Sequence, residues 1–205
     1  MFLFCMNTNP HLEIIIGTMF SGKSTELIRR VNRYEVAGKK VQLFKPTVDD
    51  RYSVDYVASH DGLMKEVFHV RNVEELKKAY NPLTEVLGID EPQFLESEII
   101  DVCQKHVNNG GICVAAFLLK DCFDNFFKFN DGKRDTSEFV RIADHVTYLR
   151  AICTYKENGD ICGQEATRVQ RFGLDGKPDL ITSPVKQVGG KKDYAPRCRK
   201  HYQFY

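Results

Sequence analysis

One stretch near the N-terminus has the residue types and spacing of a phosphate-binding loop. Residues 17–24 read Gly-Thr-Met-Phe-Ser-Gly-Lys-Ser, which satisfies the pattern G-x-x-x-x-G-K-[ST]. The glycines let the backbone turn its N–H groups toward phosphate oxygens, Lys23 can neutralise the β and γ oxygens, and the Ser24 hydroxyl can ligate Mg²⁺. The residues expected to contact phosphate are Gly17, Thr18, Met19, Phe20, Ser21, Gly22, Lys23, Ser24 and Thr25. The pattern predicts a nucleotide site rather than an ordinary glycine-rich turn.

A pair of acidic residues follows an apolar run farther along the chain. Residues 86–91 read Val-Leu-Gly-Ile-Asp-Glu. A phosphate-binding loop needs a carboxylate that reaches the metal, usually at the end of a neighbouring strand, and Asp90 is placed to hold Mg²⁺ together with Ser24. Glu91 could then accept a proton from a hydroxyl nucleophile. Acidic residues at a strand end are also typical of solvated or helix-capping positions, so the catalytic interpretation depends on the loop at 17–24.

Three cysteines and a histidine near the C-terminus form a candidate metal site. Cys153 and Cys162 are separated by eight residues, and Cys198 and His201 by two. Thiolates and imidazole are ligands that Zn²⁺ prefers, and a closed Cys₃His set is typical of a structural site. The first spacing is wider than the usual C-x₂₋₄-C, so independent reduced thiols remain an alternative. A zinc ion would fix both ends of the intervening loop, which could then close over a ligand.

Composition limits the classes of protein that remain. The 205 residues carry 29 Lys+Arg and 28 Asp+Glu, a net charge of +1, which argues against a dedicated nucleic-acid binder. No apolar run approaches the roughly 20 residues of a membrane span, and the first ten residues do not resemble a signal peptide. The seven cysteines are an odd number in a chain too long for a disulfide scaffold, which favours reduced thiols. We therefore expect a cytoplasmic protein with no membrane partner.

The elements that must position these residues alternate along the chain. Short apolar runs predict buried strands, and apolar residues at three- and four-residue spacing predict helices. The expected strands cover residues 12–16, 41–44, 86–90, 112–117 and 145–152. The expected helices run from Ser24 to a stop at Gly38 and over residues 95–107. This alternation is typical of a parallel α/β sheet covered by helices on both faces.

The character of the chain changes near Arg150. Beyond it, Cys, Gly and Pro residues lie close together and few helical periodicities are found. Such a segment is too poor in apolar residues to hold itself together without a metal. We therefore expect two domains, a P-loop α/β domain at 1–150 and a zinc-binding domain at 151–205.

These motifs, taken in order, resemble the type II thymidine kinases, the zinc-containing cellular and bacterial form. The phosphate-binding loop continues as Thr-Glu-Leu and is followed by Arg29-Arg30, which is far more specific than the general pattern. The resemblance runs over nearly the whole chain. Further similar segments are 49–53, 59–62, 89–94 and 167–171, together with 188–190 and Tyr194 of a lasso loop and the knuckle at 198–201.

The resemblance implies a RecA-like P-loop NTPase fold with a small C-terminal zinc-binding lasso domain. It also implies transfer of the γ-phosphoryl group of ATP to the 5′-hydroxyl of thymidine, with Glu91 as general base. Arg51 would help to neutralise the transferring group, and Mg²⁺ and structural Zn²⁺ would be the cofactors. The residues expected to enclose or hydrogen-bond the thymine base are Met19, Phe94, Leu119, Phe123, Val185, Gln187, Val188, Gly189 and Tyr194. Asp124 departs from the family, which has a basic or amide residue after the phenylalanine.

The resemblance further implies a homotetramer that is inhibited by its end product, thymidine triphosphate. Two alternatives stay open. One is a P-loop ATPase that uses its zinc knuckle to bind nucleic acid or a protein partner, against which the near-zero net charge counts. The other is a kinase of a different nucleoside, because a related pocket could accept deoxyuridine or another deoxynucleoside.

Overall fold

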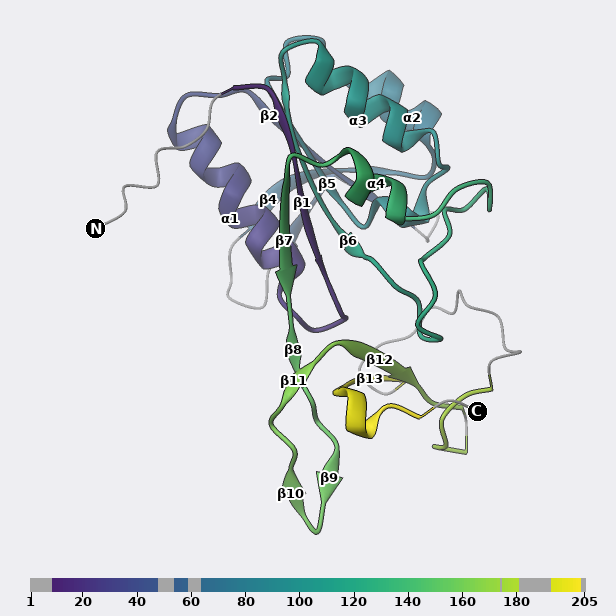
Figure 1. The fold of residues 1–205 in the computed structure, drawn as a ribbon. Helices are drawn as coiled ribbons and strands as arrows, with labels where there is room; N and C mark the ends of the chain where they lie inside the picture. Colours follow the sequence, from purple (N-terminus) through teal and green to yellow (C-terminus); the bar gives the residue numbers. More distant parts are fainter. Residues whose placement is uncertain (1–8, 48–53, 59–63, 174, 181–192, 204–205) are drawn as a thin grey trace.

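A seven-stranded sheet forms the centre of the protein in the computed structural model, which describes residues 9–47, 54–58, 64–173, 175–180 and 193–203 (Figure 1). Its strands are β1 (His11–Gly17), β2 (Val41–Pro46), β3 (Val54–Ala58), β4 (Met64–Val70), β5 (Val86–Asp90), β6 (Ile112–Leu118) and β7 (His145–Leu149). They lie in the order β3-β4-β2-β5-β6-β1-β7, and all neighbours are parallel except β3 and β4. The predicted parallel α/β sheet is confirmed.

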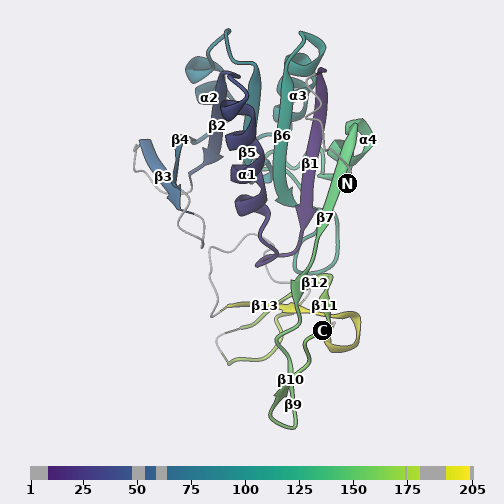
Figure 2. The ribbon, with the colours of Figure 1, turned by 90° about the vertical axis from the view of Figure 1, so that its left-hand side faces the viewer.

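Helices cover both faces of the sheet, because the central strands are apolar on both sides. They are α1 (Lys23–Val36), α2 (Val73–Ala79), the 3₁₀ turn η1 (Pro92–Phe94), α3 (Ile99–Asn108) and α4 (Ser137–Ile142). Helix α1 packs on one face, and α2, α3 and α4 pack on the other (Figures 1 and 2). Because the sheet is buried from both sides, the carboxyl ends of its strands are held rigidly at one edge.

Two expected elements have different bounds in the structure. The helix predicted over 95–107 begins only at Ile99, because Pro92 starts a separate 3₁₀ turn that ends in the extended residue Leu95. The strand predicted over 145–152 ends at Leu149. After Arg150 the chain forms β8 (Ala151–Ile152), which pairs with β11 (Glu165–Ala166) outside the large sheet. The chain therefore leaves the sheet edge near Arg150.

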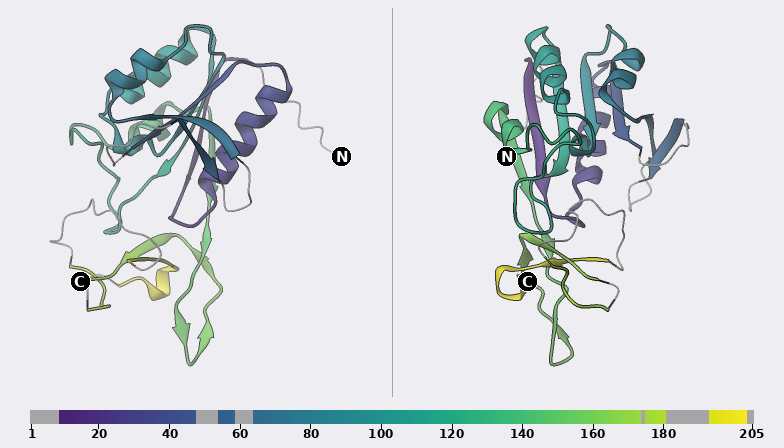
Figure 3. Two further views of the ribbon diagram at one scale, coloured as in Figure 1. Left: turned by 180° about the vertical axis from the view of Figure 1, so that it is seen from behind. Right: turned by 90° about the vertical axis from the view of Figure 1, so that its right-hand side faces the viewer.

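The C-terminal part consists of short antiparallel pairs. Besides β8 and β11, its elements are β9 (Lys156–Glu157), β10 (Asp160–Ile161), β12 (Arg168–Arg171), β13 (Tyr194–Arg197) and the 3₁₀ turn η2 (Arg199–His201). Strand β9 pairs with β10, and β12 pairs with β13. This part lies beyond the carboxyl ends of β1 and β7 (Figures 1 and 3). No helix in the described residues has the length and hydropathy needed to span a membrane.

A buried polar cluster fastens α1 to β1. The Glu13 carboxylate accepts hydrogen bonds from the Tyr34 hydroxyl at 2.7 Å and the Arg30 guanidinium at 2.6 Å, and it pairs with His11 at 2.8 Å. Burial acts to raise the pKa of Glu13, but these three partners outweigh it and lower the pKa to about 2. The cluster therefore fixes the strand and the helix that flank the loop at 18–22.

Candidate functional site

The loop between β1 and α1 has the strand–turn–helix context that the phosphate-binding motif requires. Gly22 has a φ of 83°, and Gly17 packs so closely that a Cβ atom there would lie 2.3 Å from the Leu149 carbonyl oxygen. The Lys23 side chain is buried, and its ammonium donates a hydrogen bond of 2.9 Å to the Thr18 carbonyl. The loop is therefore tightly folded, with its lysine held across it.

Asp90 lies at the carboxyl end of β5 and is 2% exposed. Its two oxygens accept bonds from the Ser24 hydroxyl at 2.9 and 3.0 Å, and Oδ2 accepts another from Lys45 Nζ at 2.7 Å. The structure thus brings together the two residues predicted to serve Mg²⁺. Hydroxyl and carboxylate oxygens are donors that fit this hard cation.

Glu91 follows Asp90 in a left-handed conformation, with φ 58° and ψ 47°. Its N–H donates to the Ala116 carbonyl at 2.7 Å, and its half-buried carboxylate accepts a bond from the Gln93 amide. Loss of solvation raises the pKa of Glu91, although the ammonium groups of Lys23 and Lys45 act in the opposite direction. A carboxylate with a raised pKa is a stronger proton acceptor, as a general base requires.

The structure gathers three of the predicted base-pocket residues. Phe123 and Tyr194 are buried in one apolar cluster with Cys122 and Val169, and Met19 packs against that cluster. The buried Arg171 guanidinium lies 5.2 Å from the centre of the Phe123 ring and donates a bond of 2.7 Å to Asp179. Residues from the phosphate-binding loop, the segment after β6 and the C-terminal strands therefore meet at one place.

The other predicted base-pocket residues lie elsewhere or are not described. Leu119 packs against the large core and lines a pocket beside Gly17 and Thr18. Phe94 packs edge-on against Phe127, with ring centres 5.6 Å apart. Five predicted site residues lie outside the described residues: Arg51, Val185, Gln187, Val188 and Gly189.

Asp124, the departure from the family pattern, has two basic partners. Its carboxylate lies 3.2 Å from the Arg168 guanidinium and 2.9 Å from the Lys120 ammonium. Arg168 belongs to β12, so the pair links the segment after β6 to the C-terminal part. Asp124 thereby anchors the segment that contains Phe123.

Sequence reasoning missed Lys45. It noticed the segment 167–171 and Asp124 but assigned no role to Val169 or to the Asp124–Arg168 pair. Lys45 comes directly after the predicted strand at 41–44, and the end of a parallel strand is a place where active-site side chains gather. That position could have drawn attention to it. The other residues depend on contacts between distant segments, for which the sequence carries no spacing signal.

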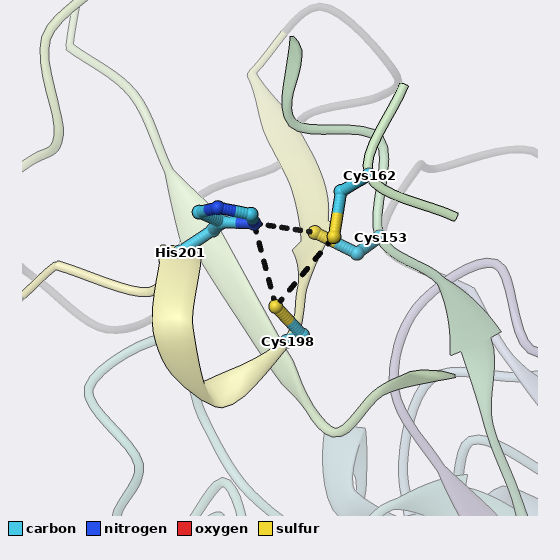
Figure 4. A group of neighbouring side chains, drawn as sticks. All are labelled: Cys153, Cys162, Cys198 and His201. Carbon is cyan, nitrogen blue, oxygen red and sulfur yellow. Dashed lines mark hydrogen bonds between the residues drawn. The ribbon is translucent and has the colours of Figure 1, made fainter. Parts of the chain in front are cut away.

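The four predicted metal ligands form one cluster (Figure 4). The nitrogen and sulfur atoms of Cys153, Cys162, Cys198 and His201 all lie within 4.8 Å of one another. His201 Nδ1 is 3.4 Å from the Cys198 sulfur and 3.7 Å from the Cys153 sulfur, and the Cys162 and Cys198 sulfurs are 4.0 Å apart. Ligands of a tetrahedral zinc ion are about 3.8 Å apart when the Zn–S distance is about 2.3 Å. The cluster could therefore hold a metal such as zinc.

Comparisons with known proteins cover nearly the whole chain. Residues 10–202 match the family model described as "Thymidine kinase". A curated relative from Thermococcus kodakarensis, named "Thymidine kinase", is 41% identical over 202 residues, which are 96% of this chain and 96% of the relative. The loop at 17–24, Asp90, Glu91 and the metal cluster all lie inside the matched region.

Proposed function

The chain belongs to the thymidine kinase family, and from this membership we propose how its described side chains carry out the reaction. The protein catalyses phosphorylation of thymidine in nucleotide salvage, with ATP and thymidine as substrates. The contact between Ser24 and Asp90, directly beside Glu91, is the observation that carries the assignment of roles.

The loop at 17–25 is proposed to bind the phosphates of ATP. Its backbone N–H groups and the Lys23 ammonium provide the positive field, and the N-terminus of α1 adds to it. Ser24 and Asp90 would hold Mg²⁺, which when bound neutralises charge on the phosphate oxygens. Arg51 is assigned to the transferring group on the family resemblance alone.

Glu91 is proposed to accept the proton of the thymidine 5′-hydroxyl. Its position beside Asp90 and its raised pKa support this role. The proton would leave the hydroxyl as the oxygen bonds to the γ-phosphorus, and the bond from that phosphorus to ADP would break. Gln93 holds the carboxylate through its side-chain amide and so fixes the direction from which the hydroxyl must approach.

The apolar cluster at the carboxyl edge is proposed to enclose the thymine base. Met19, Phe123 and Tyr194 would contact the ring. Leu119 and Phe94 are assigned to the pocket on the family resemblance alone. The backbone of the loop that contains Val185, Gln187, Val188 and Gly189 is assigned to the polar edge of the base. A selective pocket results when a wrong base leaves buried polar groups unpaired. A covered site also keeps water from the phosphoryl group.

The metal cluster is proposed to hold a structural Zn²⁺. Three thiolates and one imidazole leave no open position for chemistry. The ion would join β8, β10, β13 and η2, whose few apolar residues form only a small cluster of their own. On this basis we propose the division into a P-loop domain at 1–150 and a zinc-binding lasso domain at 151–205.

Regulation and assembly follow from the family resemblance. We propose inhibition by thymidine triphosphate, a homotetramer, a cytoplasmic location and no role for nucleic acid or membrane partners. The triphosphate carries the same base as the substrate, so it could occupy the pocket around Phe123 and Tyr194 while its phosphates extend toward the loop at 17–25.

Product analysis tests the proposal. The protein is incubated with Mg²⁺-ATP and thymidine, deoxyuridine, deoxycytidine or deoxyguanosine, with and without thymidine triphosphate. Preferential formation of thymidine monophosphate, suppressed by the triphosphate, supports both the pocket and the feedback inhibition. Equal phosphorylation of all four nucleosides would contradict the pocket assignment. A rate of ATP hydrolysis that stays the same with every nucleoside added would contradict the proposed reaction geometry.

A further inference from the structure

Lys45 is a basic residue at the carboxyl edge of the sheet. None of the roles proposed above involves it. Strand β2 runs parallel to β5 with Phe44 opposite Ile89, so Lys45, the next-to-last residue of β2, comes level with Asp90 at the end of β5. The Lys45 ammonium donates a bond of 2.7 Å to Asp90 Oδ2. The Lys45 side chain is 31% exposed, whereas that of Asp90 is 3% exposed. The buried carboxylate is therefore paired with a side chain that stays partly exposed.

The pairing with Asp90 would compete with the role proposed for that carboxylate in holding Mg²⁺. Ser24 and Lys45 share the oxygens of the same carboxylate. With Mg²⁺ held by Ser24 and Asp90, Lys45 would be bound less firmly by Asp90. Its four-carbon stem allows the ammonium to move to another anion nearby. The γ-phosphoryl group is the new negative charge that ATP brings to this edge, and charge spreads over its three equatorial oxygens during transfer.

We propose that Lys45 is a further catalytic residue, whose ammonium pairs with Asp90 in the nucleotide-free protein and moves to the γ-phosphoryl oxygens during transfer. This inference rests on the proposed phosphate site. Lys45 differs from Lys23 in its starting position, because Lys23 is bonded to the Thr18 carbonyl within its own loop. Lys23 would then meet the phosphates from the start of α1, and Lys45 would meet them from β2.

The test separates contact with the γ-phosphoryl group from a role in holding Asp90. Lys45→Met removes the charge and keeps most of the stem, and Lys45→Arg restores a charge. Lys39→Met is the matched control, because Lys39 also pairs with a carboxylate, that of Glu85 at 2.8 Å, at the opposite end of the same two strands. Equilibrium binding of Mg²⁺-ADP and of the Mg²⁺ complex of the β,γ-imido analogue of ATP is measured for each protein, with steady-state kinetics.

We expect Lys45→Met to lower kcat by about 100-fold or more, the usual effect of losing one donor to developing charge. Binding of the imido analogue should weaken about tenfold while ADP binding changes less than twofold, and Lys45→Arg should recover part of both losses. Equal weakening of ADP and analogue binding would overturn the inference, because it would mean that Lys45 only holds Asp90. Unchanged binding and kcat would overturn it too. If the wild-type protein bound neither nucleotide, the proposed phosphate site itself would be wrong.

Discussion

The ion pair between Asp124 and Arg168 provides a quantitative test of how the proposed base pocket is held in place. Asp124→Asn is the appropriate change, because Asp124 has a φ of 66° and asparagine tolerates this left-handed conformation. Arg168→Met removes the guanidinium and keeps a long apolar side chain. Combining the two substitutions in a double-mutant cycle isolates the pair from the other contacts of Arg168, which include the Tyr202 ring at 5.9 Å.

The structure sets the expected magnitude. The charged groups are 3.2 Å apart, and the two side chains are 9% and 18% exposed. At an effective dielectric constant of about 20 the attraction is about 5 kcal/mol, and removing the two ions from water costs several kcal/mol of this. We therefore expect a coupling energy of about 1 to 2 kcal/mol. Lys120→Met is the control. Its ammonium is also bonded to Asp124, at 2.9 Å, but the side chain is 40% exposed, so its loss should cost no more than about 0.5 kcal/mol.

Urea unfolding of the zinc-loaded protein at one fixed zinc concentration measures these free energies, because free metal shifts the apparent stability. The Michaelis constant for thymidine should rise in both single variants, since Asp124 adjoins Phe123. A coupling energy below about 0.3 kcal/mol would refute the reasoning, and so would a Lys120→Met variant as destabilised as Arg168→Met.

Three other predictions concern the base, the metal and a structural carboxylate. Glu91→Gln should lower kcat by about 100-fold or more while ATP binding, measured by calorimetry, changes little; a wild-type rate would remove Glu91 from the role of base. The purified protein should contain about one zinc per chain, and chelation should unfold the C-terminal part; active, folded protein without metal would contradict the Cys₃His assignment. Because the folded pKa of Glu13 is lowered to about 2, its contribution to stability should be complete above about pH 4.5 and be lost as pH falls toward 2, by about 3 kcal/mol at most. Glu13→Gln should flatten that part of the stability curve in urea titrations, and an unchanged curve would show that other groups govern acid unfolding.

Patterns confined to a few neighbouring residues were predictable from the sequence. The strand expected at 12–16 is β1 at His11–Gly17, because an apolar run of that length between turn residues has few other ways to be buried. The strand–loop–helix context of residues 17–24 and the clustering of the four Cys and His side chains were predictable for a related reason. Both patterns have residue types and a spacing that are typical of a ligand's chemistry, so they are visible before any fold is known.

Elements that depend on distant contacts could not be predicted in this way. Helix α2 and helix α4 are short, with seven and six residues. Neither is long enough to show a clear helical periodicity of apolar residues. The antiparallel pair of β3 and β4 likewise gave no signal. The bond between Lys45 and Asp90 joins residues 45 positions apart and exists only because β2 and β5 are neighbours in the sheet. A single sequence does not show the order of the strands in the sheet.

The left-handed backbone of Glu91 sets the needs of folding against those of chemistry at a single position. A residue with a side chain pays on the order of 1 kcal/mol for this conformation, whereas glycine adopts it freely. In an engineering campaign that rewards thermal tolerance alone, Glu91→Gly would count as an improvement, although it would delete the proposed proton acceptor. Libraries of this protein that are sorted only for solubility or heat resistance should therefore accumulate inactive variants with glycine at position 91. A sorting step that requires growth on salvaged thymidine is needed to keep the glutamate.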